Sequence, residues 1–391
     1  MKKALVLGGN SGIGLAVVLR LLQTGTDFVY IVGKDAPKDA DIPAEARALF
    51  AEKTSFERLD LTEEDYSVFD RIRDIDTLIV TAGFGRATLL ENLSECEIRA
   101  LVKCNELSVI QVLRKYYDRL KSHTDFFCAV MVSICGHVVS PFFSVYGAAK
   151  AGLAMFLENV NAELLAGGYP NRILDCSPGS ISGTRFNGGE NDITSLYSLA
   201  DEILANMHGR TALYIPRYEE TYRGVIERYR RDPEEYALHS YRYKQESGRI
   251  SDKPQVVVGF LSGTFDLFHI GHLNLLRRAK EQCDYLIVAV HGSGAWKKKE
   301  TFIPYEERVA IVKSIRYVDE VVRDYAEDAD AWQDFHYDKL FVGSDYKGTE
   351  RFNRYEEFFR DKGVEIVYFP YTAGTSSTQL REAITSASLK K

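Results

Sequence analysis

The sequence predicts an α/β protein of two domains, each organised around a parallel sheet. The chain of 391 residues is long for one domain and comfortable for two. In the first half, short apolar runs alternate with helical segments, which is typical of a doubly wound sheet. In each half an apolar run ends at a glycine-containing turn: GGNSGIG from Gly8 to Gly14, and SGTFDLFHIGH from Ser262 to His272.

Composition and charge exclude several classes of protein. The chain is 45% hydrophobic and 27% charged, and its net charge of -7 argues against a general nucleic-acid binder. No run approaches the roughly 18 apolar residues of a membrane span, and the apolar run within MKKALVLGGN is too short for a signal peptide. The six cysteines form no CxxC pair and indicate reduced thiols. We therefore expect a cytoplasmic protein without nucleic-acid or membrane partners.

The first half begins with a strand, a glycine-rich turn and a helix. Helical apolar spacing over 13–22 follows the turn. Glycines let the backbone approach a pyrophosphate, and the helix N-terminus adds N–H groups and positive potential. This order predicts a dinucleotide site. The apolar runs that we predict to be strands are 4–7, 28–32, 77–81, 127–132 and 172–176.

A second set of residues in the first half indicates carbonyl chemistry. Tyr146 and Lys150 lie four apart, so they share one face of a helix. A phenol is a poor acid at neutral pH, but a neighbouring ammonium lowers its pKa and lets it protonate a developing alkoxide. Ser133 follows an apolar strand, where its hydroxyl can orient a carbonyl oxygen.

With these motifs in this order, residues 1–190 resemble the short-chain dehydrogenase/reductase family. The resemblance implies that Tyr146 is the acid and that Lys150 binds the ribose and lowers the phenol pKa. It also implies that Ser133 positions the carbonyl and that Asn105 holds a water of the proton relay. The cofactor-binding residues that it implies are Gly8, Asn10, Ser11, Gly12, Ile13, Gly14, Lys34, Asp60, Leu61, Ala82, Gly83, Pro178 and Gly179.

Four positions bear on how closely the family pattern is followed. Thr81 stands where the family usually has asparagine, and the threonine expected after the Pro-Gly turn arrives one place late, at Thr184. Lys34 occupies the place of an arginine in NADP-preferring members, and a cation there favours a 2′-phosphate. Asp35 follows immediately, and an acidic residue would instead bind the ribose hydroxyls. We expect NADP(H), with NAD(H) as the alternative.

Residues 191–253 are rich in Tyr, Arg and Glu and are expected to form a helical extension broken near Pro233. Two interpretations stay open. The extension is a solvated connector with helical pieces, or it is an interface, because Tyr and Arg are favoured at contact hot spots. The second domain is expected over 254–391, where RISDKP precedes an apolar strand over 256–261.

The strand of the second domain runs into GTFDLFHIGH, where His269 and His272 open a helix. Two histidines at this spacing can be metal ligands, but no third ligand is evident nearby, so we expect no protein-held metal. Gly263 and Gly271 instead indicate close approach of the backbone to a ligand.

The chain from 256 to 384 resembles the glycerol-3-phosphate type of cytidylyltransferase, in the nucleotidyltransferase superfamily marked by HxGH. The motifs are SGTFDLFHIGH, YEER before SIRYVDEVV, FVGSDYKG and YTAGTSSTQLR, although Tyr371 stands where the family usually has arginine. The resemblance implies a Rossmann-like domain. It also implies in-line attack of a substrate phosphate on the α-phosphorus of CTP, through positioning and charge stabilisation.

The same resemblance implies roles for single residues. His269 and His272 would bind α-phosphate oxygens, Lys299 would neutralise phosphate charge, and Lys297 would hold the incoming phosphomonoester. Mg²⁺ would be held mainly by the triphosphate. The CTP-binding residues that it implies are Gly263, Thr264, Phe265, His269, His272, Lys299, Asp345, Thr375, Ser376, Ser377 and Thr378.

The two resemblances together imply bifunctional synthesis of a CDP-activated polyol, of the kind used in cell-wall or capsular polymers. NADPH-dependent reduction of a keto-sugar phosphate, for which we favour ribulose 5-phosphate, would give a polyol phosphate. CTP-dependent transfer would then give CDP-ribitol and pyrophosphate. One alternative is a triose substrate that ends in CDP-glycerol, and another is a transferase regulated by a non-catalytic NADP(H)-sensing domain. Both families commonly form dimers, so we expect a homodimer or homotetramer.

Overall fold

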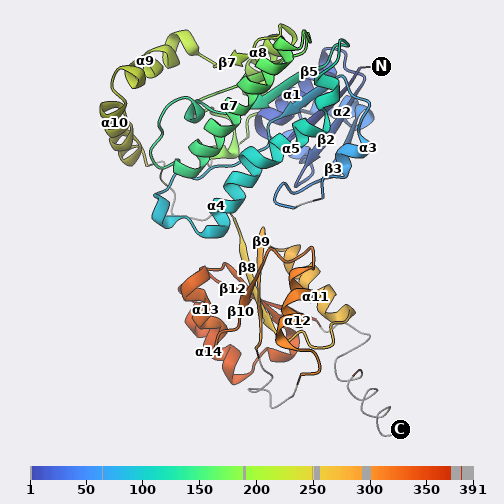
Figure 1. Ribbon diagram of the computed structural model, residues 1–391, viewed down its shortest axis with the longest axis vertical. Helices are drawn as coiled ribbons and strands as arrows, with labels where there is room; N and C mark the ends of the chain where they lie inside the picture. The colour runs from blue at the N-terminus through green and yellow to red at the C-terminus, as the bar shows by residue number, and fades with distance from the viewer. Residues whose placement is uncertain are drawn as a thin grey trace. The chain divides into compact units, whose positions relative to one another are not determined.

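The computed structural model describes residues 2–63, 65–187, 191–248, 250, 256–292, 301–370 and 380. The chain divides into two compact units, Met1–Lys253 and Pro254–Lys391 (Figure 1). Each unit contains one parallel sheet with helices packed on it, which confirms the predicted fold class. Among the described residues, no helix combines the length and apolar character needed to cross a membrane.

The first unit is built on seven parallel strands in the order β3-β2-β1-β4-β5-β6-β7. The order reverses between β1 and β4, so a crevice opens at the carboxyl ends of these two strands. The register pairs Leu7 with Val80, which brings the glycine-rich turn and Thr81 side by side there. The strands are β1 (Lys3–Leu7), β2 (Phe28–Gly33), β3 (Thr54–Arg58), β4 (Thr77–Val80), β5 (Phe127–Met131), β6 (Ile173–Cys176) and β7 (Leu213–Tyr214).

Helices cover both faces of this sheet (Figure 1). One apolar cluster joins the sheet to α1 and α8, and a second joins the opposite face to α5 and α7. The long helix α7 carries Tyr146 in its first turn, so packing of α7 on the sheet fixes the position of that phenol. The helices are α1 (Gly12–Gln23), α2 (Arg47–Lys53), α3 (Val68–Arg71), α4 (Glu95–Val102), α5 (Ser108–Lys115), α6 (Tyr117–Leu120), α7 (Ser144–Ala166) and α8 (Tyr197–His208).

The predicted extension, residues 191–253, begins with α8 and with β7, the last strand of the sheet. After β7 it consists of a π-helical turn η8 (Tyr218–Tyr222) and two helices, α9 (Arg223–Arg231) and α10 (Pro233–Glu246). The predicted break near Pro233 is confirmed, because Asp232 ends α9 and caps α10 by accepting a hydrogen bond from Glu235 N at 2.9 Å. Ile226 of α9 is buried against Val138 and Ile215, whereas α10 has no buried residue.

The second unit has five parallel strands in the order β10-β9-β8-β11-β12, with the reversal between β8 and β11. Its strands are β8 (Val258–Gly263), β9 (Tyr285–Val290), β10 (Glu320–Arg323), β11 (Lys339–Gly343) and β12 (Glu365–Phe369). Its helices are α11 (Ile270–Lys280), α12 (Tyr305–Lys313), α13 (Asp328–Phe335) and α14 (Glu350–Phe359). The GTFDLFHIGH segment leaves the carboxyl end of β8, beside the reversal point, where α/β sheets bind ligands.

Candidate active sites

The glycine-rich turn of the first unit is too tightly packed for side chains. Gly8 has φ +87°, and a Cβ on it would lie 2.5 Å from Ala82 N. A Cβ on Gly14 would lie 2.1 Å from Gly8 O. Gly12, with φ +50°, is the first residue of α1, so the N–H groups of the first turn of α1 lie just after the end of β1. This cradle fits a pyrophosphate, which needs close backbone approach and N–H donors.

Lys34 and Asp60 form an ion pair at the ends of β2 and β3, with 3.3 Å between Nζ and Oδ2. Burial acts to raise the pKa of Asp60. The Lys34 ammonium and hydrogen bonds from Thr62 outweigh burial, so this pKa is lowered. The Lys34 side chain is 46% exposed. Its cation thus stays at the surface of the crevice, where the adenosine end of a dinucleotide binds in this fold.

The tetrad predicted from sequence comes from three separate elements. Tyr146 and Lys150 lie on α7, and Ser133 follows β5. Asn105 lies in a π-helical turn, η4 (Lys103–Leu107), between α4 and α5. Such π-turns occur frequently at functional sites. All four side chains are buried.

Asn105 and Lys150 converge on Gly83. Asn105 Nδ2 donates to Phe84 O at 2.8 Å and to Leu101 O at 2.9 Å, while its buried Oδ1 has no partner among the described residues. A Cβ on Gly83 would lie 2.6 Å from this Oδ1 and 3.5 Å from Lys150 Nζ. An acceptor and an ammonium therefore face one small space, which suits a bridging water.

The pKa values of Tyr146 and Lys150 are both set by burial. Burial raises the pKa of the Tyr146 phenol, and a hydrogen bond with Ser133 acts against it. This direction is opposite to the one expected from the neighbouring ammonium, because Lys150 Nζ donates to Met131 O at 2.8 Å and lies 5.8 Å from the phenol ring centre. Burial lowers the pKa of Lys150 to about 8. The phenol is thus protonated at neutral pH, as a proton donor must be.

Aromatic rings flank the Tyr146 phenol. Phe143 and Phe186 each lie with ring centres 5.6 Å from Tyr146. Gly85 allows the approach of this cluster, because a Cβ on it would lie 2.8 Å from the Tyr146 ring. The loop that carries Gly85 is anchored by Arg86, which makes a buried ion pair of 2.8 Å with Glu97. Sequence reasoning missed this pair, since nothing near Arg86 indicates a buried partner.

The turn after β6 completes the cofactor side of the crevice. Pro178 O accepts a hydrogen bond from Ile134 N at 2.9 Å, so the turn lies beside the Ser133 segment. Thr184, which comes one place later than the family pattern expects, still lies beside the glycine-rich turn. A Cβ placed on Gly12 would lie 3.7 Å from Thr184 Cβ. Gly183, with φ +78°, accommodates the extra residue in the loop.

In the second unit the two histidines form one cluster at the start of α11. Their rings stack at 4.0 Å, and His269 Nδ1 accepts from Gly271 N at 3.0 Å. His269 N donates to His272 Nδ1 at 3.4 Å. Because each Nδ1 accepts, the proton of each neutral ring lies on Nε2, and Nε2 becomes a donor.

Burial lowers the pKa of both imidazoles. For His272 burial acts first and His269 adds to it, giving a pKa of about 4. For His269 burial alone lowers the pKa. Both rings are therefore neutral hydrogen-bond donors at neutral pH, which suits binding of phosphate oxygens.

Two buried charged residues hold the segment around these histidines, and sequence reasoning assigned neither of them this role. Asp266, 3% exposed, accepts hydrogen bonds from Phe302 N and Ile303 N at 3.1 and 3.0 Å. Arg308 is fully buried. Its guanidinium donates to the carbonyl oxygens of Thr264, His291, Gly292 and Ile303.

The remaining predicted CTP contacts are placed in part. Gly263 ends β8, Thr264 and Phe265 follow it in the turn, and Phe265 takes a left-handed φ of +52°. Asp345 is exposed at the end of β11, the strand beside β8. Lys297, Lys299, Tyr371, Thr375, Ser376, Ser377 and Thr378 lie outside the described residues.

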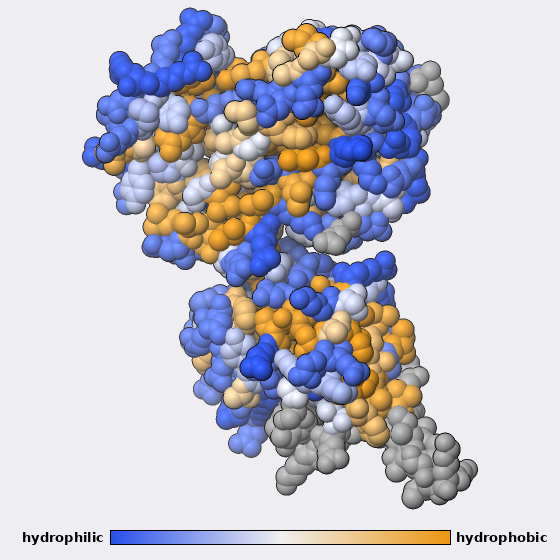
Figure 2. Space-filling model, viewed as in Figure 1, coloured by the Kyte–Doolittle hydropathy of each residue, from blue (hydrophilic) through white to orange (hydrophobic). Residues whose placement is uncertain are grey.

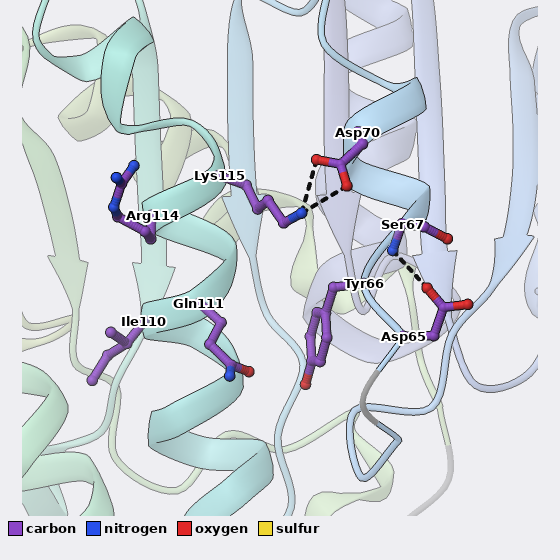
Figure 3. A pocket seen from close by; sticks show the side chains of 8 residues that line it. All are labelled: Asp65, Tyr66, Ser67, Asp70, Ile110, Gln111, Arg114 and Lys115. Atoms are coloured by element: carbon purple, nitrogen blue, oxygen red, sulfur yellow. Dashed lines mark hydrogen bonds and ion pairs between the residues drawn. The ribbon is translucent and has the colours of Figure 1, made fainter. Parts of the chain in front are cut away.

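A surface hollow of about 580 Å³ lies elsewhere on the first unit, between α5 and the segment leading into α3 (Figure 3). Lys115 of α5 pairs there with Asp70 of α3 at 2.7 Å. None of the predicted site residues lines it, so we do not assign the catalytic site to this hollow. Its lining residues are Asp65, Tyr66, Ser67, Asp70, Ile110, Gln111, Arg114 and Lys115.

Known proteins resemble the two units separately. Residues 2–193 match the short chain dehydrogenase family, and residues 260–383 match the cytidylyltransferase-like family. A glycerol-3-phosphate cytidylyltransferase of Bacillus subtilis is 39% identical over 126 residues, 31% of this chain and 92% of that protein. An uncharacterized short-chain type dehydrogenase/reductase of Sinorhizobium fredii is 30% identical over 234 residues, 56% of this chain and 88% of that protein.

A solved short-chain dehydrogenase from Streptomyces avermitilis has the fold of the first unit, with a TM-score of 0.50 and 17% identity. The match covers 63% of this chain and all of that one. The chain therefore belongs to the short-chain dehydrogenase/reductase family through its first unit and to the cytidylyltransferase-like family through its second, and it is a bifunctional enzyme.

Proposed function

We propose that this enzyme reduces a keto-sugar phosphate with NADPH and joins the resulting polyol phosphate to CMP from CTP. We favour ribulose 5-phosphate as substrate and CDP-ribitol as product. The observation that carries the proposal is the presence, in one chain, of an assembled Ser133–Tyr146–Lys150 group and a cytidylyltransferase unit. An assembled group of this kind also favours catalysis over a purely sensing role.

The reduction needs a hydride and a proton. Bound NADPH would supply the hydride to the carbonyl carbon. Ser133 would donate a hydrogen bond to the carbonyl oxygen, and the Tyr146 hydroxyl would transfer its proton to the developing alkoxide. Lys150 would bind the ribose hydroxyls, and a water between its ammonium and Asn105 Oδ1 would return a proton. The orphaned Oδ1 supports this last role.

The cation at the adenosine end supports NADPH over NADH. Lys34 lies at the end of β2 with almost half of its side chain exposed, and it already balances the Asp60 carboxylate. A 2′-phosphate there would gain a charge-assisted hydrogen bond, which is worth about 1.5–3 kcal/mol.

For the transfer, an oxygen of the polyol phosphate would attack the α-phosphorus of CTP while pyrophosphate leaves. The Nε2–H groups of His269 and His272 would donate to α-phosphate oxygens and stabilise the charge that builds up there. Mg²⁺ would enter with the triphosphate. Lys297, Lys299 and the TSST segment from Thr375 to Thr378 are proposed contacts that rest on the resemblance alone.

A triose substrate is the second candidate, because the Bacillus subtilis relative of the second unit is named for glycerol 3-phosphate. In that case dihydroxyacetone phosphate would be reduced and CDP-glycerol formed.

We also infer a homodimer or homotetramer. Apolar side chains gather at the surface over α4 and α5 (Figure 2), where Val102 and Leu107 are 38% and 45% exposed. Met155 and Leu165 of α7 are 57% and 67% exposed. A contiguous apolar patch at the surface, as over α4 and α5, favours a protein contact. A strictly monomeric mass by light scattering would contradict this inference.

NADPH oxidation by the full chain tests the reductase step. Ribulose 5-phosphate, xylulose 5-phosphate and dihydroxyacetone phosphate would each be offered, and we expect the highest kcat/KM with ribulose 5-phosphate. A highest value with the triose would replace the favoured substrate by the second candidate. No oxidation with any of them would refute the proposed reduction.

A further inference from the structure

The extension reaches the reductase site through Tyr222, the last residue of η8. A Cβ placed on Gly179 would lie 1.5 Å from the Tyr222 hydroxyl oxygen, so this hydroxyl occupies the space that a side chain at position 179 would need. The turn containing Gly179 is bonded to Ile134, next to Ser133, through Pro178 O. The Tyr222 hydroxyl therefore lies at the end of the sheet where the carbonyl substrate has to bind.

Helix α10 contacts the loop that precedes Tyr146. Tyr241 stacks on Phe142, with ring centres 4.6 Å apart. Lys244 donates hydrogen bonds to Ser140 Oγ and to Pro141 O, the latter at 3.0 Å. These contacts fix the loop that leads into α7 and Tyr146. Since Phe142 has φ +69°, the loop is strained and depends on such support.

The surroundings of Tyr146 and of Tyr222 differ in chemistry. The Phe143 and Phe186 rings lie beside the Tyr146 phenol, tilted at 56° and 53° to it. The extension contributes the phenols of Tyr222 and Tyr236, both partly buried against the cluster around Val138. Phenol hydroxyls match the hydroxyl groups along an open-chain keto-sugar phosphate.

We propose that Tyr222 determines the specificity of the reductase, because its hydroxyl hydrogen-bonds a hydroxyl next to the reacting carbonyl. A tyrosine hydroxyl both donates and accepts, so it can bond to the protein and to the substrate at the same time. The ligand class is a short, open-chain, hydroxylated ketone phosphate. Tyr241 and Lys244 are positioning residues for the loop before Tyr146. This inference rests on the proposed reduction.

The test compares Tyr222→Phe with the wild type and with Tyr229→Phe. Tyr229 packs on the same cluster and lies 5.8 Å from the Tyr236 ring, but no contact places it at Gly179. The substrates are ribulose 5-phosphate and two analogues, each lacking one hydroxyl beside the carbonyl, at carbon 1 or carbon 3. The readouts are kcat/KM for each substrate and the Kd of NADPH.

We expect the wild type to prefer ribulose 5-phosphate over one of the analogues by at least about tenfold, because an unpaired polar group in the site penalises that analogue. Tyr222→Phe should lose about tenfold in kcat/KM on ribulose 5-phosphate and little on that analogue, with the Kd of NADPH unchanged. Tyr229→Phe should behave as the wild type.

Two results would overturn the inference. In the first, Tyr222→Phe keeps the full preference for ribulose 5-phosphate over the analogue. In the second, Tyr222→Phe loses activity equally on all three substrates and also loses affinity for NADPH, which would mean that Tyr222 only supports the Gly179 turn. Failure of the proposed function appears differently, since the wild type itself then reduces no ketose phosphate, and the inference falls with it.

Discussion

The buried Lys150 and the partly buried His272 have pKa values far from those of free side chains, and in both cases burial is the first cause. An ammonium enclosed by α7 and β5 loses its hydration, so its pKa falls to about 8. The imidazole of His272, the last residue of the GTFDLFHIGH segment, also loses hydration, so it resists protonation. Each effect is measurable.

The first prediction concerns the pH dependence of reduction. Because the pKa of Lys150 is about 8, its ammonium is lost as the pH rises above that value. The kcat/KM for NADPH, which reports the free enzyme, should fall about tenfold per pH unit above the break. Steady-state rates from pH 6 to 10 measure it. A profile that stays flat to pH 10 would show that the ammonium is not needed.

The second prediction concerns the protonation of the histidine pair. With a pKa of about 4, His272 should stay neutral down to pH 5, whereas an ordinary histidine titrates near 6.5. NMR titration of protein labelled at histidine Cε1 follows each ring, and His272→Gln identifies the resonance. A midpoint at or above 6.5 for His272 would contradict the neutral-donor role.

At the scale of elements, six strands were predicted from apolar runs, whereas the edge strands and the interior strands β9 and β11 of the second unit were not. Apolar runs followed by turns mark β1, β2, β4, β5, β6 and β8. The edge strand β3 reads TSFER and lacks an apolar run. The strand β7 has only two residues and depends on pairing with β6, a tertiary contact that local sequence does not encode.

In the candidate sites, too, local motifs were visible in the sequence and contacts made by tertiary packing were not. Motif residues such as Tyr146 and His269 were found because their spacing is local. Arg308 belongs to a motif seen in the sequence, but its role as a donor to distant carbonyls was not visible. Tyr222 meets Gly179 from 43 positions away, and only the packing of the extension brings the two together.

The third prediction concerns the turn around the histidines. Arg308→Met keeps an unbranched apolar stem but removes the donor of four carbonyl oxygens, one bond buried and three part-buried, at about 1–3 kcal/mol for each group that stays unpaired. We expect the second unit to lose at least about 3 kcal/mol of stability and its transferase activity.

Urea unfolding of the second unit measures that loss. Arg360→Met, at an exposed position after α14, is the control and should change stability by less than about 0.5 kcal/mol. Equal stability of the two variants would contradict the role assigned to Arg308.

At the scale of the whole molecule, two compact units carry two separate sets of candidate catalytic groups. Tyr146→Phe removes only the proton donor of the first, so it should lower NADPH-dependent reduction at least about 100-fold. Transfer of CMP to preformed ribitol 5-phosphate should be unchanged. His272→Ala should give the reverse pattern. Loss of both activities in either variant, measured side by side, would show that the two sites are not independent.

The most direct test of the two-step account is the mass of the product formed from ribulose 5-phosphate, CTP and Mg²⁺, with and without NADPH. The account predicts CDP-pentitol only when NADPH is present, and none from the Tyr146→Phe variant. Preformed ribitol 5-phosphate should give the same product without NADPH. If ribulose 5-phosphate yields no CDP-pentitol with NADPH while preformed ribitol 5-phosphate does, the reductase does not feed the transferase and the central claim is wrong.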